Sequence, residues 1–135
     1  MKFDATTTNR YESAPIDRSI FRILAEDIAD NDPVTMLELI DLFVNDSGQH
    51  IREISQGVEK QNIRTIEMGA HSVKSTAATF GAMTLSVLCA QIEQLAYTKE
   101  IDDIDEILEL AYDEFLRVEA ELSVERKKWM KVANL

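Results

Sequence analysis

The sequence contains few of the residues that interrupt helices or cross-link a chain. Among its 135 residues are four glycines, two prolines and one cysteine, Cys89. One cysteine cannot form an internal disulfide, which fits a reducing compartment, and its helical spacing with Leu85 and Ile92 predicts a small buried core residue. No alternating run of Val, Ile or Thr is present, so the apolar positions are tested for the helical period.

Long apolar runs and basic residues are also scarce. No apolar run approaches the roughly 20 residues that cross a bilayer, and the opening MKFDATTTNR lacks the apolar stretch of a secretion signal, so we expect a cytoplasmic protein. Lys and Arg total 14 against 25 Asp and Glu, a formal net charge of −11. Phosphate backbones and anionic lipids repel such a surface, which argues against nucleic acid and membranes as partners.

Apolar residues recur in steps of three and four, the period of an amphipathic helix. Asp32 followed by Pro33 predicts the start of a long helix, because Asp accepts an orphan amide and Pro at the first turn needs no donor. Asn62 can cap the next helix, and Gly81 suits a left-handed helix stop. The inward positions of the two helices are predicted at Leu37, Ile40, Val44, Ser47, Ile51, Ile54 and Val58, and at Ile63, Ile66, Ala70, Val73, Ala77 and Phe80.

Three further helices complete the expected fold. One is predicted from Asp17, one from about Ala82 to Thr98, and one that Asp102 or Asp103 can cap. The sequence therefore predicts an all-α fold, an antiparallel four-helix bundle over residues 17–132, with a short additional N-terminal helix at one end and a flexible arm over 1–16. The inward positions are predicted at Ile20, Ile23, Leu24 and Ile28, at Leu85, Leu88, Ile92 and Leu95, and at Ile104, Leu108, Ala111, Phe115, Val118 and Leu122.

A nearly uncharged window surrounds one histidine. From Met68 to Ile92, Lys74 is the only Lys, Arg, Asp or Glu, whereas 29% of the chain is charged. Each residue of a helix advances by about 100°, which places His71 roughly 130° from the centre of the inward face, on the solvent side.

An exposed imidazole beside an ammonium has a chemical use. With an ordinary pKa of about 6.5, much of the imidazole is neutral and nucleophilic at neutral pH and can accept a phosphoryl group. Lys74, one turn beyond His71, can offset the added negative charge. Short uncharged neighbours would let another protein approach without desolvating charges, or would let two helices of this chain pack tightly. These neighbours are Met68, Ser72, Ser75, Ala78 and Thr79.

The stretch AHSVKSTAATFGA, followed by LCAQIEQLA, resembles the histidine-containing phosphotransfer (HPt) domain of multistep two-component relays. The usual motif of that family is AH-x-LKG with small residues, then a Gly and a downstream C-x-x-(I/L)-E. The segments PIDRSIFRIL and LELIDLFVNDSGQHIREI resemble the short leading helix and the long helix that precede the histidine. The resemblance extends from about Pro15 to Leu122.

The resemblance implies a phosphocarrier with no ATP site and no kinase activity, which takes a phosphoryl group from the aspartate of one response-regulator receiver domain and passes it to another. His71 would be the phosphoacceptor and Lys74 its electrostatic support. Glu93 matches a position near the active histidine in some members, or is an ordinary exposed glutamate. The implied partners are receiver domains and a hybrid sensor kinase, with Mg²⁺ on the receiver, no cofactor on this chain, and a monomer as the simpler expectation.

One residue departs from the family pattern. Ser75 stands where the family usually has glycine, and its hydroxymethyl group could crowd the site or donate a hydrogen bond to the phosphoryl group. The main alternative function is a binding-only helical adaptor that docks receiver domains without phosphotransfer.

Two other classes fit less well. A sensor kinase dimerisation helix usually has an acidic residue after the histidine and a proline soon after, whereas Ser72 follows here and no proline does. A metal-binding bundle is weaker still, because His50 and His71 lie on different predicted helices and neither forms a Glu-x-x-His repeat. His50 is predicted to be a solvated residue of a polar face.

Overall fold

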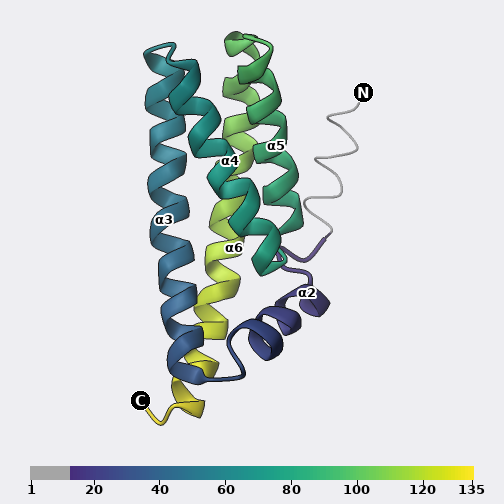
Figure 1. Cartoon of the computed structure of the whole chain (residues 1–135), viewed down its shortest axis with the longest axis vertical. Helices are drawn as coiled ribbons and strands as arrows, with labels where there is room; N and C mark the ends of the chain where they lie inside the picture. The colour runs from purple at the N-terminus through teal and green to yellow at the C-terminus, as the bar shows by residue number, and fades with distance from the viewer. Residues whose placement is uncertain (1–12) are drawn as a thin grey trace.

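The computed structural model describes residues 13–135, which are helical throughout apart from short turns and contain no strand. Four long helices run side by side, and a short helical segment crosses one end of them (Figure 1). The predicted four-helix bundle with a leading helix is therefore confirmed. The elements are α2 (Arg18–Ile23), the π-helix η1 (Leu24–Ile28), α3 (Pro33–Glu59), α4 (Ile63–Phe80), α5 (Met83–Tyr97), the 3₁₀ turn η2 (Ile101–Asp103) and α6 (Ile104–Val132).

The four long helices form a square in which each packs against two others. α4 contacts α3 and α5, and α6 contacts the same two helices from the opposite side, so α4 and α6 are diagonal neighbours. The core between them is apolar, as the helical period predicts. Its most completely buried large side chains include Met36, Ile40, Ile54, Ile66, Leu85, Leu88, Ile92, Ile104 and Ile107.

The predicted helix ends are largely correct. A side-chain oxygen of Asp32 accepts a hydrogen bond from the backbone amide of Thr35 at 2.9 Å, and Asn62 does the same for Thr65 at 3.1 Å. Gly81 ends α4 in the left-handed region with φ of 86°. Asp103 is the N-cap residue of α6, one of the two positions predicted, but its side chain forms no cap hydrogen bond, because a 3₁₀ turn leads into the helix.

The inward face predicted for the first helix is also partly wrong. Ile23 and Ile28 are 54% and 60% exposed, whereas Phe21 and Leu24 are buried. Ile23 points outward because the buried side of α2 is formed by Phe21 and Leu24. For Ile28 the cause is the π-helix that continues α2, in which the amide of Ala29 bonds to the carbonyl of Leu24, five residues back, and Ala29 is buried instead. A wider turn rotates the following side chains away from the positions expected for a regular α-helix.

The predicted N-terminal arm falls mostly outside the described residues, which begin at Ser13. Ile16, which the prediction placed in the arm, is buried with 1% of its surface exposed. The backbone amide of Asp17 donates a 2.8 Å hydrogen bond to the carbonyl of Gly81, which joins the segment before α2 to the end of α4. The core therefore begins one residue earlier than the predicted boundary.

Two glycines let α3 and α4 approach closely. A Cβ on Gly69 of α4 would lie 2.9 Å from Cγ1 of Ile54 and 3.2 Å from the backbone oxygen of His50, and a Cβ on Gly57 of α3 would lie 2.9 Å from Cγ1 of Ile66. Real Cβ atoms do not approach neighbours at 2.9 Å, so this packing depends on the missing side chains. The contact fixes the rotation of α4 about its own axis and thereby the direction of its outer residues. No helix within residues 13–135 has the length and apolar character to cross a membrane.

Candidate functional site

The site begins with the outward direction of one face of α4. The inner positions of this helix, at Ile66, Ala70, Val73 and Ala77, are fully buried. His71 lies on the opposite side, and 62% of its side-chain surface is exposed. The predicted solvent exposure of this imidazole is therefore confirmed.

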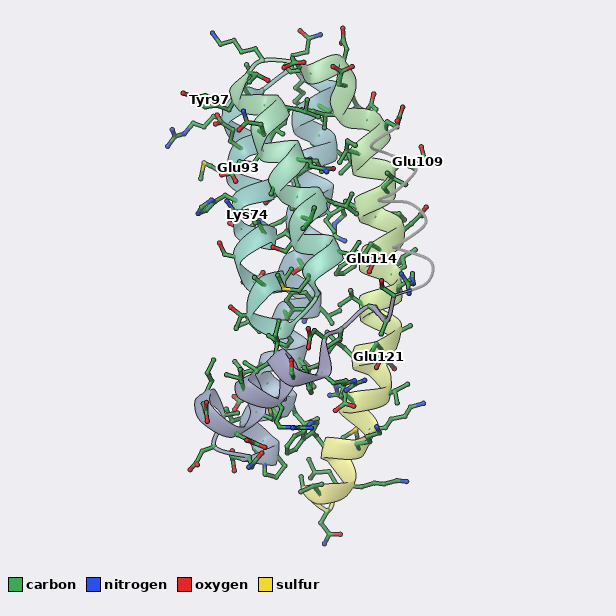
Figure 2. All side chains as sticks on the ribbon, turned by 90° about the vertical axis from the view of Figure 1, so that its right-hand side faces the viewer. Lys74, Glu93, Tyr97, Glu109, Glu114 and Glu121 are labelled. Atoms are coloured by element: carbon green, nitrogen blue, oxygen red, sulfur yellow. The ribbon has the colours of Figure 1, made fainter. Side chains whose placement is uncertain are left out.

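Glu93 on α5 contacts two side chains of α4, the imidazole of His71 and the ammonium of Lys74. Its Oε2 lies 2.9 Å from Nδ1 of His71, and its Oε1 lies 2.6 Å from Nζ of Lys74. Figure 2 shows Lys74 and Glu93 on the same flank of the bundle. Of the two interpretations that the sequence leaves open for Glu93, the structure supports the one that places it beside the histidine.

The contact with Glu93 distinguishes the two ring nitrogens of His71. A carboxylate only accepts hydrogen bonds, so Nδ1 must carry the proton of the neutral ring. Nε2 then has the free lone pair, and no described residue hydrogen-bonds to it. The exposed nitrogen is therefore the nucleophilic one.

The carboxylate of Glu93 is held in its charged form. Partial burial by itself would raise the pKa of this group, but hydrogen bonds from Lys74 and His71, together with the positive charge of Lys74, outweigh burial and keep the pKa below its ordinary value. About a quarter of the Glu93 side chain, 27%, is exposed. At neutral pH the site thus has a fixed negative charge between a cation and an imidazole.

α5 contributes a buried hydroxyl that joins it to α4 and a buried thiol. The hydroxyl of Ser86, which is buried, donates a 2.8 Å hydrogen bond to the backbone oxygen of Lys74. Cys89 is fully buried as predicted, and burial raises the pKa of its thiol to about 12. Its thiol therefore stays protonated and takes no nucleophilic part in the site.

The predicted docking residues form an uncharged surface around the imidazole. Met68 is 58% exposed, Ser75 and Thr79 are exposed, and Ser72 and Ala78 are half-buried. Thr79 donates its hydroxyl to the backbone oxygen of Ser75, which ties that polar group back to the helix. The short side chains thus face outward rather than serving only close packing inside the bundle.

A shallow apolar groove beside this surface was not predicted. It encloses about 250 Å³ between α3, α4 and the π-helix, with Ser72 and Thr79 on its α4 side. Leu42 of α3 and Ile28 line the other side and are 58% and 60% exposed. The sequence signal for the groove is that Leu39, Leu42 and Phe43 are apolar although they fall outside the predicted inward positions of their helix.

His50 also borders this groove. Its Nδ1 lies 2.9 Å from Oε1 of Glu53, and 34% of its side chain is exposed, so it is less solvated than the sequence predicts. Within residues 13–135, no group of three or more His, Cys, Asp or Glu side chains is arranged to hold a metal ion.

The sequence matches the profile of the Hpt domain over residues 38–126. The chain belongs to the Hpt domain family. His71, Lys74 and Glu93 all lie within the matched region. Membership assigns the chain to histidine phosphotransfer in two-component signalling, in which HPt proteins are phosphocarrier intermediates.

Solved HPt structures share the fold. Histidine-containing phosphotransfer protein B from Pseudomonas aeruginosa PAO1 is 28% identical, with a TM-score of 0.77 over 86% of this chain and 98% of that chain. A putative histidine-containing phosphotransfer protein from rice is 20% identical, with a TM-score of 0.75 over 98% and 95% of the two chains. ZmHP2 from maize is 20% identical, with a TM-score of 0.72 over 91% and 98%. A search of curated protein sequences found no significant match.

Proposed function

We propose that His71 accepts a phosphoryl group from the aspartyl phosphate of one receiver domain and passes it to the aspartate of a second. The observation that carries the proposal is the arrangement of the imidazole, whose exposed Nε2 has a free lone pair while Nδ1 is held by Glu93. The chain then acts as a carrier between response-regulator receivers, with a hybrid sensor kinase as the source of the phosphoryl group and the cytoplasm as the implied compartment.

The transfer step is a displacement at phosphorus. The lone pair of His71 Nε2 forms the new N–P bond, the P–O bond to the receiver's aspartate breaks, and that aspartate leaves as a carboxylate. The ring becomes a phosphorylated imidazolium that keeps its Nδ1 proton, and the carboxylate of Glu93 at 2.9 Å offsets the positive charge that appears there. Reversal of these bond changes on a second receiver regenerates the neutral imidazole.

Lys74 and Glu93 have separate proposed roles. Glu93 fixes the orientation and tautomer of the imidazole, as carboxylate partners of functional histidines do. Lys74 pairs with Glu93 before transfer, and its half-buried ammonium lies one turn from His71, near enough to attract phosphoryl oxygens afterwards. Phosphoryl transfer depends mainly on positioning and charge, and we assign the Mg²⁺ ion to the partner receiver.

The docking surface of the proposal combines the uncharged residues of α4 with Glu93. Met68, Ser72, Ser75, Ala78 and Thr79 present no charge to be desolvated, so a receiver can bring its acidic, Mg²⁺-containing pocket close to the imidazole. These residues are the proposed contact set.

The direct test of the proposal is phosphate uptake by His71. The wild-type chain, incubated with a phosphorylated receiver, should gain a label that is labile in acid and stable in alkali. His71→Gln should fold normally, as circular dichroism would show, and gain none. Persistent labelling of that variant refutes the assignment, and receiver binding by the wild type without any labelling would instead indicate a binding-only adaptor.

Variants of the two supporting residues test their roles separately. Lys74→Ala should slow transfer or shorten the lifetime of the phosphorylated form without abolishing either. Glu93→Gln keeps a side-chain oxygen that can accept from Nδ1 but removes the charge, so it should lower the transfer rate less than Glu93→Ala does. Equal rates for the wild type and both Glu93 variants would remove the proposed role of that carboxylate.

A further inference from the structure

The charges of α6 and the turn before it are segregated along the chain. Residues 100–114 contain eight Asp or Glu and no Lys or Arg, whereas residues 117–131 contain five Lys or Arg and three Glu. A rod with opposite charge at its two ends is complementary to a second copy of itself in the antiparallel direction. It is not complementary to itself in the parallel direction, where like charges meet.

The outer face of α6 carries this segregation. Glu109, Leu116, Ala120 and Lys127 point in nearly the same direction on a helix that advances by about 100° per residue. All four are exposed, and Leu116, the larger of the two apolar residues among them, is 42% exposed. Because α6 packs against α3 and α5 on its inner side, this face points away from α4, and Figure 2 shows Glu109 on the outer side of the bundle.

The charges that point inward or sideways from α6 already have partners. Glu121 and Glu125 both pair with Arg18 of α2, and Arg126 pairs with Asp41 of α3. In contrast, the outward charges of α6 form no ion pair with any residue of the described range 13–135. These unpaired groups include Glu106, Glu109, Lys127 and Lys131.

We propose that two copies of this chain associate through antiparallel α6 helices, related by a twofold axis near residue 118. In that register, Leu116 of one copy faces Ala120 of the other at the centre. Glu109 faces Lys127, and Glu106 falls within one residue of the position opposite Lys131. The twofold symmetry doubles each pair and produces four ion pairs around an apolar centre.

The exposed apolar side chains fit the same arrangement. Tyr112 lies four residues before Leu116 and Val124 four residues after Ala120, so both would flank the centre of the contact. Their side chains are 51% and 52% exposed. From Glu106 to Lys131 the helix extends about 38 Å at 1.5 Å per residue. A single helix pair of this length is a small interface, so we expect a dissociation constant in the micromolar range or weaker.

The dimer leaves the phosphotransfer site open. α4, which carries His71, is diagonally opposite α6, so the two imidazoles would face outward on the two far sides of the assembly. A dimer differs from the monomer that the sequence suggests. The complementary charges on the outer face of α6 can be recognised only once the inner and outer sides of that helix are known.

The test is charge reversal followed by sedimentation equilibrium of the full chain. The wild type should show a concentration-dependent mass that rises from 15.3 kDa toward twice that value, and added salt should shift the equilibrium back to the monomer. Glu109→Lys and Lys127→Glu should each weaken self-association, by about tenfold or more in the dissociation constant. A matched control is Glu38→Lys, which makes the same change at an exposed site on α3.

A mixture of the two reversed chains distinguishes this register from a general charge effect. Glu109→Lys paired with Lys127→Glu restores opposite charges at every facing position, so the mixture should form heterodimers while each variant alone stays monomeric. A wild type fixed at 15.3 kDa up to about 1 mM overturns the proposal. The proposal is also overturned if neither charge reversal changes the dissociation constant of the dimer, or if the mixture of the two variants does not associate.

Discussion

At His71, one hydrogen bond from a neighbouring helix selects the reactive nitrogen. The Glu93 carboxylate accepts a hydrogen bond from Nδ1 at 2.9 Å and another from Nζ of Lys74 at 2.6 Å, so the three side chains are connected before any phosphoryl group arrives. Phosphorylation at Nε2 would place new negative charge within reach of the same ammonium. In the proposed mechanism Lys74 would therefore have two successive anionic partners, and the first of them, Glu93, keeps it near the site.

Ser75 provides a prediction beside the proposed phosphoacceptor, His71. Its hydroxyl forms no hydrogen bond with any residue of the described range, and it lies one turn beyond His71 on the exposed side of α4. Ser75→Gly should leave the rate of transfer from a phosphorylated receiver unchanged or raise it, because it opens space above the imidazole. A large loss of rate in a rapid-quench assay would show instead that the hydroxyl binds the phosphoryl group.

Cys89 provides a second residue-scale prediction. Because burial raises the pKa of its thiol to about 12, less than about one molecule in 10⁴ carries a thiolate at neutral pH. The folded chain should therefore react with an aromatic disulfide reagent only as fast as it unfolds, and addition of urea should release the reactivity. Rapid modification of the native chain would contradict the burial seen here.

At the scale of elements, the α3–α4 contact positions the histidine, and it depends on residues without side chains. Gly57 and Gly69 stand where a Cβ would collide with the facing helix. Sequence periodicity does not reveal them, because a glycine inside an amphipathic helix is indistinguishable by pattern from a position that is merely tolerated. Their only sequence signal is to be glycines inside segments that otherwise favour helix, and Gly48 shares it without a close contact.

Alanine substitutions at two helical glycines test this contact. Gly69→Ala forces Ile54 or the backbone of His50 to move, and overpacking of this kind costs about 1–3 kcal/mol of the free energy of unfolding, more than the helix gains. Gly48→Ala is the matched control, because its Cβ would have neighbours no nearer than 3.6 Å and should stabilise α3 by about 0.5–1 kcal/mol. Urea denaturation of both variants measures the difference. Equal effects of the two substitutions would mean that the close approach has no energetic role.

At the scale of the whole molecule, the N-terminal helix is attached to the far end of α6 by charge. Arg18 pairs with Glu121 and with Glu125, whose side chain is only 9% exposed, and its guanidinium lies 5.6 Å from the ring centre of Phe21. A buried carboxylate that loses its partner is costly, whereas an exposed pair contributes little. The ion pairs of Arg18 are therefore expected to contribute more to the free energy of unfolding than the surface pair between Asp41 and Arg126.

Two arginine variants compare these pairs. Arg18→Met keeps the apolar stem but leaves Glu125 with only Lys128 at 3.4 Å, and should lower the free energy of unfolding by about 1–3 kcal/mol. Arg126→Met removes a pair whose side chains are 42% and 47% exposed, and should lower the free energy of unfolding by less than Arg18→Met does. The comparison is made by urea denaturation at low ionic strength. A larger loss for Arg126→Met would contradict this account.

Local sequence was sufficient for every feature that depends on a single helix. The start at Asp32, the cap at Asn62 and the stop at Gly81 were predictable because capping is chemistry between neighbours in the chain. The outward direction of His71 was predictable for the same reason, since a helix of fixed pitch determines which residues share a face. The exception is the first helix, where the inner side falls on Phe21 and Leu24 rather than Ile23, and where the π-helix breaks the assumed pitch and exposes Ile28.

Features that join two helices required the packed bundle. Glu93 is 22 residues from His71 in the chain, and its hydrogen bond to Nδ1 exists because α4 and α5 pack in one register and no other. The groove between α3 and α4, and the separation of inner from outer charges on α6, likewise depend on which faces are covered. Helix pitch is a local property of the backbone, whereas register and covered faces result from the packing of side chains distant in the chain.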